Sequence, residues 1–542
     1  MAQLGATTVV ATAVTLLALF VSRFLTNRRH VRKLQEAKAP MPAYHPVFGH
    51  LVAVKKAMQN LPRNVTTHVM VRVIAKQFPK GIFYLNLWPF NKTLMVVANP
   101  YTAAQIEAAF LDKPQVITDT LEVIMGGPSL MTMHGGTWKK WRALFNPGFA
   151  PNYITRLAPA IADETAVLCQ LLHDAARQGD MFQLEEYTLR LTFDIISQVT
   201  LGSRLHYQTQ GSVLADGVRR QVYWTPFATS FNPFRRFLSP RPLIQKYTSF
   251  CIDRYLSGEI DKRFDELVQS RRDPAKHIQA RSVLSLVMDE YLKDVSDTKE
   301  LSREAFKQLV IPQLRLFLYA GHDTTSSTLL YCYYLLFQHP DILEKVRSEH
   351  DTVFGSDFSI EHIQQEVTRD ATQFNKIPYT QAVIKEVLRL FPPGASIRDG
   401  RSDLILTDED GKQYPTEDCY IWTLNLVMHH SPEVFAKPDE FIPDRWLVEP
   451  HDPLYPKKGS WRAFEWGPRA CIGQTLAQLE LKVVLVMTLR MFDINVAYAE
   501  WDKKHAKKGI TTVEGNRVYQ AEMGGAGSHP VDGFPVKITL RA

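Results

Sequence analysis

The chain has 542 residues, 45% of them hydrophobic and 22% charged, and it contains neither an internal repeat nor a long Gly/Ser linker, so it predicts one large globular unit. Its net charge of +7 is spread along the sequence without a basic stretch interleaved with aromatic residues, which excludes nucleic acid as a partner. The five cysteines are widely spaced and odd in number, which excludes a disulfide framework and favours a reducing compartment.

The chain begins with an uncharged apolar stretch from Leu4 to Val21, close to the roughly 20 residues that span a bilayer. Four basic residues follow between positions 28 and 33, and no charged residue precedes the stretch. By the positive-inside rule, this places the N-terminus in the lumen and the rest of the chain in the cytosol. A cleaved signal peptide is the alternative, but neither a basic start nor a small-residue cleavage site is visible. We therefore predict a membrane anchor over residues 1–27.

Residues 28–50 join this basic segment to a proline-rich run. Pro40, Pro42 and Pro46 disfavour a helix, so the sequence predicts an extended hinge that sets the body at a fixed angle to the membrane. An ordinary loop would have the same sequence signature. The remaining residues, 51–542, form the predicted catalytic body.

The body is predicted to be mostly α with small β-sheets, an α+β fold. Two apolar runs between residues 81 and 100 flank a turn and predict a β-hairpin, and a second hairpin is predicted around Asp410-Gly411. Weaker strand signals lie at 517–520 and 536–540. Nearly everything between residues 158 and 390 has helical periodicity instead.

A helix is predicted to start after Gly135-Gly136, and it carries Trp138 and Arg142. Residues four apart share one face of a helix, so the indole N–H and the guanidinium can point at one anion. A tryptophan and an arginine on one face more often belong to the core and the surface, respectively. The pair therefore indicates an anion site only in combination with other motifs.

The longest predicted helix, residues 302–338, contains the sequence Ala320-Gly-His-Asp323-Thr324-Thr. A glycine inside a helix costs about 1 kcal/mol relative to alanine, so Gly321 requires a reason. The small Ala320 and Gly321 would let a flat cofactor lie against the helix, and Asp323 with Thr324 forms an acid–alcohol pair that can pass protons. The alternative is a helix contact between small residues, with threonine bonded to its own helix.

Near the C-terminus, a predicted helix follows the sequence Phe464-Glu-Trp-Gly467-Pro-Arg469-Ala-Cys471-Ile-Gly473. The thiolate is the metal-binding form of cysteine, and its pKa falls near positive charge and a helix N-terminus. Arg469 supplies charge, the two glycines allow close approach of a flat partner, and Phe464 would cover the sulfur from water. The pattern predicts a metal ligand at Cys471. A buried structural cysteine is the alternative.

Taken together, these motifs resemble those of the cytochrome P450 superfamily. The cysteine segment matches its haem-binding pattern Phe-x-x-Gly-x-Arg-x-Cys-x-Gly, and Ala-Gly-x-Asp-Thr-Thr matches its oxygen-activation motif. The resemblance covers nearly the whole chain and implies the cytochrome P450 fold, with haem b held by the thiolate of Cys471 as axial iron ligand. It implies Asp323 and Thr324 as the catalytic residues that deliver protons. The residues implied to bind the cofactor are Cys471, Arg469, Phe464, Gly473, Trp138, Arg142, Arg398, Ala320 and Gly321.

The same resemblance assigns a structural role to three charged residues. Glu386 and Arg389 lie one turn apart on a predicted helix, and in isolation such a pair is a common surface salt bridge. The family adds a downstream arginine, which matches Arg445 here. The three are implied to form a buried triad that supports the haem loop and takes no part in catalysis.

The resemblance implies a membrane-anchored haem-thiolate monooxygenase that uses O₂ and NADPH-derived electrons to hydroxylate, epoxidise or similarly oxidise a hydrophobic small molecule. No flavin or nicotinamide fingerprint is present, so a separate NADPH-dependent cytochrome reductase is the expected electron donor. The expected location is the endoplasmic reticulum membrane, with the catalytic body in the cytosol. Residues 441–446 and 452–462 are similar to those of fungal secondary-metabolism members, which implies a polyketide or terpenoid substrate.

Two other functions remain open at this point. A haem-thiolate isomerase or dehydratase would act without O₂, and the intact Asp323-Thr324 pair argues against it. A non-catalytic haem-binding protein would need neither a proton relay nor a membrane anchor. Substrate identity and oligomeric state have no readable signal in the sequence.

Overall fold

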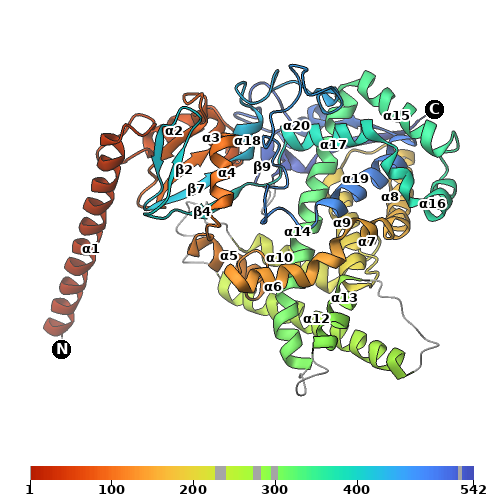
Figure 1. Ribbon diagram of the computed structural model, residues 1–542, viewed down its shortest axis with the longest axis horizontal. Coiled ribbons are helices and arrows are strands. Elements are labelled where there is room, and N and C mark those ends of the chain that lie inside the picture. Colours follow the sequence, from red (N-terminus) through yellow and green to blue (C-terminus); the bar gives the residue numbers. More distant parts are fainter. Residues whose placement is uncertain (1, 226–239, 273–281, 295–302, 523–527, 542) are drawn as a thin grey trace.

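A computed structural model of the chain describes residues 2–225, 240–272, 282–294, 303–522 and 528–541. One long helix, α1 (Ala2–Glu36), projects from a mostly helical body that carries small sheets (Figure 1). The predicted fold class is therefore confirmed. The helices of the body are α2 Leu51–Met58, α3 Thr67–Ala75, α4 Pro100–Ala108, α5 Gln115–Met125, α6 Gly135–Phe145, α7 Pro151–Thr155, α8 Ala158–Gln178, α9 Leu184–Leu201, α10 Val213–Tyr223, α12 Arg241–Arg272, α13 Val283–Asp294, α14 Arg303–Gln338, α15 Pro340–Phe354, α16 Ile360–Arg369, α17 Pro378–Leu390, α18 Asn425–His429, α19 Gln474–Leu489 and α20 Tyr498–Lys504. Short 3₁₀ turns cover η1 Asn146–Phe149, η3 Ala371–Asn375, η4 Pro443–Trp446 and η5 Val531–Gly533.

Local sequence explains where many of these helices begin and end. The Asn99 side chain caps α4 by accepting a hydrogen bond from the Thr102 amide at 3.0 Å, and Pro100 occupies the first helical position. Helices α8 and α9 both end at a glycine in the left-handed conformation, Gly179 and Gly202. These caps satisfy backbone groups that the helix itself leaves unpaired.

The largest sheet has the strand order β1-β2-β7-β4. Strands β1 (Ile82–Leu85) and β2 (Thr93–Val97) are antiparallel and form the first predicted hairpin. Strand β7 (Cys419–Thr423) runs parallel to β2, with Thr93 opposite Cys419, and antiparallel to β4 (Ser396–Asp399). The sheet thus joins residues separated by more than three hundred positions and ends beside Arg398.

The other sheets are small. The second predicted hairpin is confirmed as β5 (Ile405–Thr407) paired with β6 (Gln413–Pro415). A three-stranded sheet has the order β3-β11-β8, and a two-stranded sheet pairs β9 with β10. Their bounds are β3 Phe182–Gln183, β8 Phe492–Val496, β9 Gln520–Ala521, β10 His529–Pro530 and β11 Pro535–Leu540.

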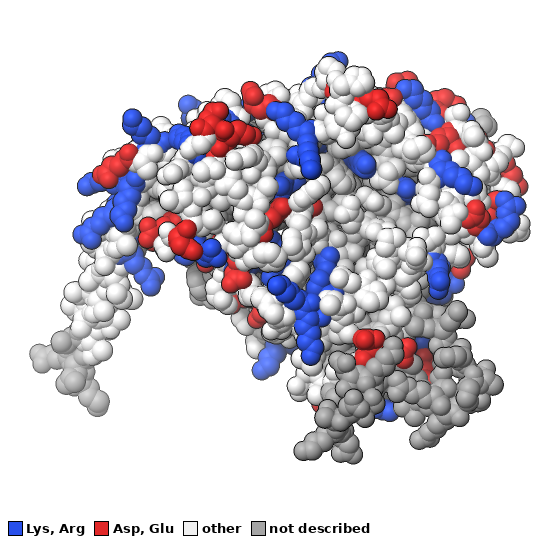
Figure 2. Space-filling view, in the orientation of Figure 1, with Lys and Arg blue, Asp and Glu red and all other residues white. Residues whose placement is uncertain are grey.

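Among the described residues, one helical segment is long and apolar enough to cross a membrane, Val10–Glu36, with a mean hydropathy of 1.5 in its best window and none of that window buried. Helix α1 continues through the basic part of the predicted hinge, so only residues 37–50 lack α-helical structure there. Arg28 attaches this part of the helix to the body, because its guanidinium donates to the Tyr44 hydroxyl at 2.7 Å and to Asn86 Oδ1 at 2.9 Å. Lys and Arg side chains gather where α1 meets the body (Figure 2).

Helix α14 crosses the centre of the body (Figure 1). Side chains on all sides of this helix are buried over most of its length, which is typical of a core helix. The helix continues through Pro312 and packs along α9. This position carries the predicted acid–alcohol pair into the interior of the protein.

Candidate active site

The cysteine loop, which we define as residues 464–473, forms a tight turn in front of α19. The Cys471 amide donates a hydrogen bond to the carbonyl oxygen of Phe464 at 2.9 Å. Gly467 has a φ of +77°, in the left-handed region that favours glycine, so the turn itself requires this residue. Gly473 has a φ of −85°, and a Cβ there would lie 3.9 Å from the Cys471 sulfur. Glycine at position 473 therefore leaves room beside the sulfur and is not required by the backbone conformation.

Solvent reaches the Cys471 side chain. Many protein atoms nevertheless surround the sulfur, and this partial desolvation raises the pKa of the thiol. Three groups lower the pKa of the thiol: the backbone amides of Gly473 and Gln474 and the guanidinium of Arg142. The predicted amide donors of the helix N-terminus are thus in place. The cation that lowers the pKa of the thiol is Arg142 on α6, whereas the sequence pattern points to Arg469.

Arg469 instead turns toward α6. Its guanidinium carbon lies 4.1 Å from the centroid of the Trp138 ring, and it donates to the carbonyl oxygen of Met133 at 3.0 Å. Trp138 is buried, and Arg142 lies one turn further along the same helix. The loop and α6 therefore bring together the three predicted residues Trp138, Arg142 and Arg469.

Two more cations join this group. Burial, Arg398 and Arg142 lower the pKa of Arg469 to about 10, against an opposing effect of Asp112. Burial, Arg398 and Arg469 lower the pKa of Lys113 to about 7. Burial also lowers the pKa of Arg398 and of Arg142. Neighbouring cations thus lower the pKa of Arg469 and Lys113, whereas the carboxylates Glu465, Glu107 and Asp112 raise that of Arg398. A site with several cations is suited to bind an anion of more than one negative charge.

The predicted acid–alcohol pair lies on a part of α14 that is incompletely buried. The Thr324 hydroxyl donates to the carbonyl oxygen of Ala320 at 2.9 Å, so this side chain bonds to its own helix. The Asp323 carboxylate lies 3.1 Å from Nε2 of His529. The hydroxyl and the carboxylate are neighbours in sequence, but each has a partner of its own.

Gly321 is explained by helix packing. A Cβ at this position would lie 2.7 Å from Cγ1 and 2.8 Å from Cδ1 of Ile196 on α9, closer than real contacts allow. Ile196 of α9 therefore packs directly against the α14 backbone where α14 lacks a side chain. The small-residue helix contact, which the sequence offered as the alternative to a cofactor surface, therefore accounts for this glycine.

We expect the Gly321→Ala variant to lose about 1–3 kcal/mol of folding free energy, because the added methyl group forces α14 away from α9. The matched control is Gly258→Ala in α12, where an added Cβ meets nothing within 4 Å. That change is expected to raise stability by about 0.5–1 kcal/mol, as helix propensity predicts. Thermal unfolding midpoints of the two variants test this, and a Gly321→Ala protein as stable as the wild type would contradict the packing explanation.

His529 connects two carboxylates on different helices. Its Nε2 atom faces Asp323 Oδ1 at 3.1 Å and its Nδ1 atom faces Glu185 Oε1 at 2.6 Å, and the imidazole is 2% exposed. Burial by itself lowers the pKa of His529, but the two carboxylates outweigh burial and raise the pKa to about 10. The imidazole is therefore a cation at neutral pH.

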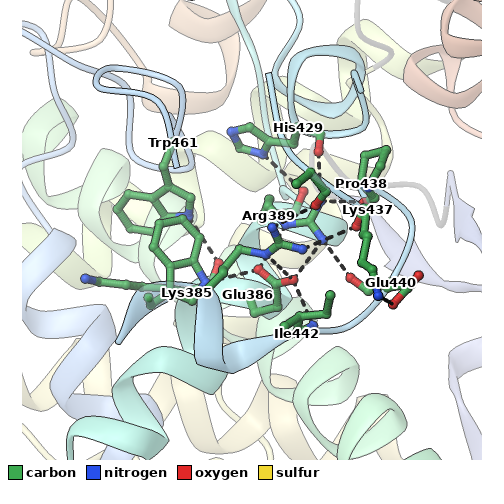
Figure 3. Close-up of polar contacts among 12 residues, drawn as sticks. Lys385, Glu386, Arg389, His429, Lys437, Pro438, Glu440, Ile442 and Trp461 are labelled. Carbon is green, nitrogen blue, oxygen red and sulfur yellow. Dashed lines mark hydrogen bonds and ion pairs between the residues drawn. The ribbon is translucent and has the colours of Figure 1, made fainter. Parts of the chain in front are cut away.

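The predicted structural triad is confirmed. Glu386, Arg389 and Arg445 have completely buried side chains, with Arg389 Nη2 at 2.8 Å and Arg445 Nε at 3.0 Å from Glu386 Oε1. The Trp446 indole and the Ile442 amide also donate to this carboxylate, each at 3.0 Å. Figure 3 shows Glu386 and Arg389 facing each other within a ring of backbone carbonyl groups.

A short chain of hydrogen bonds links the triad to the cysteine loop. Arg389 donates to the carbonyl oxygen of His429 at 2.8 Å, and Nε2 of His429 accepts from the Arg462 amide at 3.1 Å. The Trp461 indole donates to the carbonyl oxygen of Lys385 at 3.1 Å, and its ring packs against Phe464 with centroids 5.8 Å apart. The triad therefore fixes the segment that leads into the loop.

The family model described as Cytochrome P450 matches residues 39–520. The chain belongs to the cytochrome P450 family. It is 34% identical over 533 residues to the cytochrome P450 monooxygenase polC of Polytolypa hystricis, covering 97% of this chain and 94% of that one. It is 30% identical over 503 residues to the cytochrome P450 monooxygenase acrF of Aspergillus aculeatus, covering 88% of this chain and 98% of that one. The protein is a cytochrome P450 monooxygenase.

Solved P450 structures share the fold. The crystal structure of the cytochrome P450 CYP102L1 has a TM-score of 0.70 at 20% identity and covers 93% of this chain and 99% of that one. The haem domain of cytochrome P450DA has a TM-score of 0.69 at 19% identity, with coverage of 93% and 98%. At this identity the similarity establishes the P450 fold.

The P450 family implies haem, and the residues in the structure fit it. Cys471 presents an exposed sulfur beside amide donors and Arg142, as a thiolate iron ligand requires. The cation cluster of Arg142, Arg398, Arg469 and Lys113 matches the two carboxylates of a haem. When bound, haem supplies the iron centre that reduces O₂. The chain itself supplies the thiolate, the cations that hold the carboxylates, and the polar groups of α14.

Lys113 and His529 could not be found from the sequence. Lys113 precedes a proline in an otherwise unremarkable segment, and nothing there marks it as an anion ligand. His529 is separated from Asp323 by 206 residues, and the pair forms only because β10 packs against α14. Both residues are recognised as part of the site only from their tertiary contacts.

Proposed function

We propose that this P450 is a membrane-anchored monooxygenase of fungal secondary metabolism that oxidises a hydrophobic small molecule, a polyketide or terpenoid intermediate. Residues 1–27 form the anchor in the endoplasmic reticulum membrane, residues 28–50 connect it to the body, and residues 51–542 form the cytosolic catalytic domain. The fungal monooxygenases polC and acrF, similar over most of the chain, support this assignment. The exposed, apolar α1 supports the membrane location.

In this proposal, Cys471 would hold the iron of haem b through its thiolate. Trp138, Arg142, Arg398 and Arg469 hold its carboxylates. Asp323 and Thr324 deliver protons from α14, by general-acid catalysis through hydroxyl and water. The remaining cofactor contacts in this proposal come from Phe464, Gly473 and Ala320, whereas Gly321 packs against Ile196 of α9.

The monooxygenase proposal rests mainly on two polar side chains within a core helix. Asp323 and Thr324 stand on α14, whose other positions are mostly apolar and buried, and the carboxylate has an ionised partner there. Asp323 and Thr324 match the proton-delivery motif of the family, and this match argues against an isomerase or dehydratase that acts without O₂.

Electrons come from a separate NADPH-dependent cytochrome reductase in the same membrane. Lys139 and Lys140 on α6 are exposed, on the helix that carries Trp138 and Arg142. Positive charge near the haem carboxylates can attract the acidic surface of such a donor and raise its rate of association.

The test uses microsomes that contain the full-length protein and an NADPH-dependent cytochrome reductase, incubated under ¹⁸O₂ with an apolar extract of the producing fungus. We expect a product that carries one ¹⁸O atom and forms only when NADPH is present. A product that forms equally under nitrogen would instead identify an isomerase or dehydratase. A protein that binds haem but consumes no substrate under either gas would identify a non-catalytic haem carrier.

A further inference from the structure

The short strand β10, which precedes the last strand β11, places one buried imidazole between two helices of the core. His529 reaches Asp323 on α14 with Nε2 and Glu185 on α9 with Nδ1, at 3.1 and 2.6 Å. The side chains of Glu185 and Asp323 are themselves only 10% and 13% exposed. Three ionisable groups from three separate parts of the chain thus form one buried line, Glu185–His529–Asp323.

The position of His529 is fixed by its own strand as well as by the carboxylates. The Ser327 hydroxyl on α14 donates to the carbonyl oxygen of Ser528 at 2.6 Å, and His529 pairs with Ala521 in the β9–β10 sheet. The Tyr498 hydroxyl donates to the carbonyl oxygen of Val531 just beyond β10. Contacts that do not involve Asp323 therefore fix the imidazole, so that it can orient that carboxylate.

Other described titratable groups near this line are uncharged at neutral pH. Tyr331 and Tyr498 lie near Glu185, and burial raises the pKa of both hydroxyls. His322 on α14 is buried, which lowers its pKa, and its Nδ1 lies 2.7 Å from the carbonyl oxygen of Leu318. Burial and the charge of Asp323 raise the pKa of the Tyr319 hydroxyl on the same helix, so this group is also uncharged at neutral pH. Within the described part of the chain, His529 is thus a charged group that faces both Glu185 and Asp323.

We propose that His529 is a positioning residue of the monooxygenase reaction, which holds the Asp323 carboxylate in one orientation for proton delivery and is itself oriented by Glu185. The inference rests on the proposed role of Asp323. Replacing the imidazole removes the Nε2 contact that holds Asp323 Oδ1 at 3.1 Å, together with the positive charge beside both carboxylates. A buried carboxylate that loses a neighbouring cation takes up a proton more readily. Either change slows the transfer of protons from this side chain.

The first experiment measures how the electrons of NADPH are used by the reductase-reconstituted holoenzyme. Two electrons and two protons convert O₂ either into water and one oxygen atom for the substrate or into free hydrogen peroxide. Slow proton delivery from Asp323 favours peroxide, so the peroxide released per NADPH reports on that delivery. We expect His529→Gln and Asp323→Asn to slow the formation of water or product on the order of tenfold, with a matching rise in peroxide. Glu185→Gln is expected to show a smaller rise in peroxide than these two variants.

The matched control is His350→Gln. His350 is also a fully buried histidine, bonded to the Thr380 hydroxyl at 2.9 Å on helices away from Asp323, and burial lowers its pKa to about 3. This variant should lose stability but keep the wild-type peroxide ratio. If Asp323→Asn releases more peroxide and His529→Gln does not, the positioning role is wrong while the role of Asp323 stands. If neither variant differs from wild type, the proton-delivery role of Asp323 is wrong, and the positioning role with it.

A second experiment observes the imidazole directly and does not depend on turnover. In protein labelled with ¹⁵N-histidine, the resonances that disappear in His529→Gln, or shift in Glu185→Gln, belong to His529. We expect both ring nitrogens to be protonated at pH 8, where the buried His350 and His429 are neutral. A neutral His529 ring at pH 8 would overturn the proposal, and this result needs either variant only as folded protein, without turnover.

The pH dependence of stability gives an independent measure. The pKa of His529 is raised from 6.5 to about 10 in the folded protein, so its stabilising effect is complete below pH 6.5 and is lost as the pH rises toward 10. The difference in thermal midpoint between wild type and His529→Gln should therefore be constant below pH 6.5 and shrink above it. A difference that grows with pH would show that the imidazole is not the cation of the line.

Discussion

The Glu386→Ala variant is expected to lose about 3–5 kcal/mol of folding free energy, because it leaves two buried guanidinium groups without their anion. Arg389 and Arg445 are as fully buried as Glu386 and bond to it at 2.8 and 3.0 Å. The Ile442 amide and the Trp446 indole lose their acceptor in the same variant. Since both arginines also hold backbone carbonyls of the segment before the cysteine loop, the loop is expected to lose its order first.

An exposed ion pair of the same spacing serves as the control for this variant. Lys437 and Glu440 are also three residues apart, 3.4 Å between charged atoms, but both side chains are more than half exposed. Glu440→Ala is expected to change stability by less than about 1 kcal/mol, because solvent screens such a pair. Thermal unfolding and the fraction of purified protein that retains haem report on both variants. Equal losses in Glu386→Ala and Glu440→Ala would contradict the structural role of the triad.

The Cys471→Ala variant is expected to lose monooxygenase turnover, by about a thousandfold or more, while the fold is kept. Its side chain is exposed, so removing the sulfur leaves no cavity in the core. Without the thiolate, the amides of Gly473 and Gln474 and the guanidinium of Arg142 have no negative sulfur to stabilise. The chemistry that depends on electron donation from sulfur is lost with it.

Cys251→Ala is the matched control, since Cys251 is a partly exposed cysteine on α12, outside the cysteine loop. It should retain wild-type turnover and haem content. NADPH-dependent product formation measured on the two variants separates loss of one particular thiolate from loss of any accessible thiol. Retained turnover in Cys471→Ala would refute its role as ligand.

Sequence alone predicts those parts of the molecule whose functional residues lie close together along the chain. The cysteine loop is such a part, because a turn in front of a helix fixes Gly467, Cys471 and the amide donors within ten positions. The two hairpins and the mostly helical body follow in the same way from local periodicity and turn residues. The triad partner Arg445 became predictable through the resemblance to the family.

Sequence does not predict which side chains meet when the contact depends on packing between distant elements. The thiol is influenced by Arg142 on α6, although Arg469 is only two residues away, because Arg469 turns onto Trp138. Gly321 is small because Ile196 of α9 lies against it. Each of these contacts depends on how two elements are placed relative to each other, and no local sequence pattern specifies that placement.

The absorption spectrum of the reduced, CO-bound protein tests the haem-thiolate assignment of Cys471 most directly. We expect the wild type to show the red-shifted Soret band of thiolate-ligated haem, and Cys471→Ala to lack that band while Cys251→Ala retains it. A wild-type protein that binds haem but shows no red-shifted band would contradict the assignment.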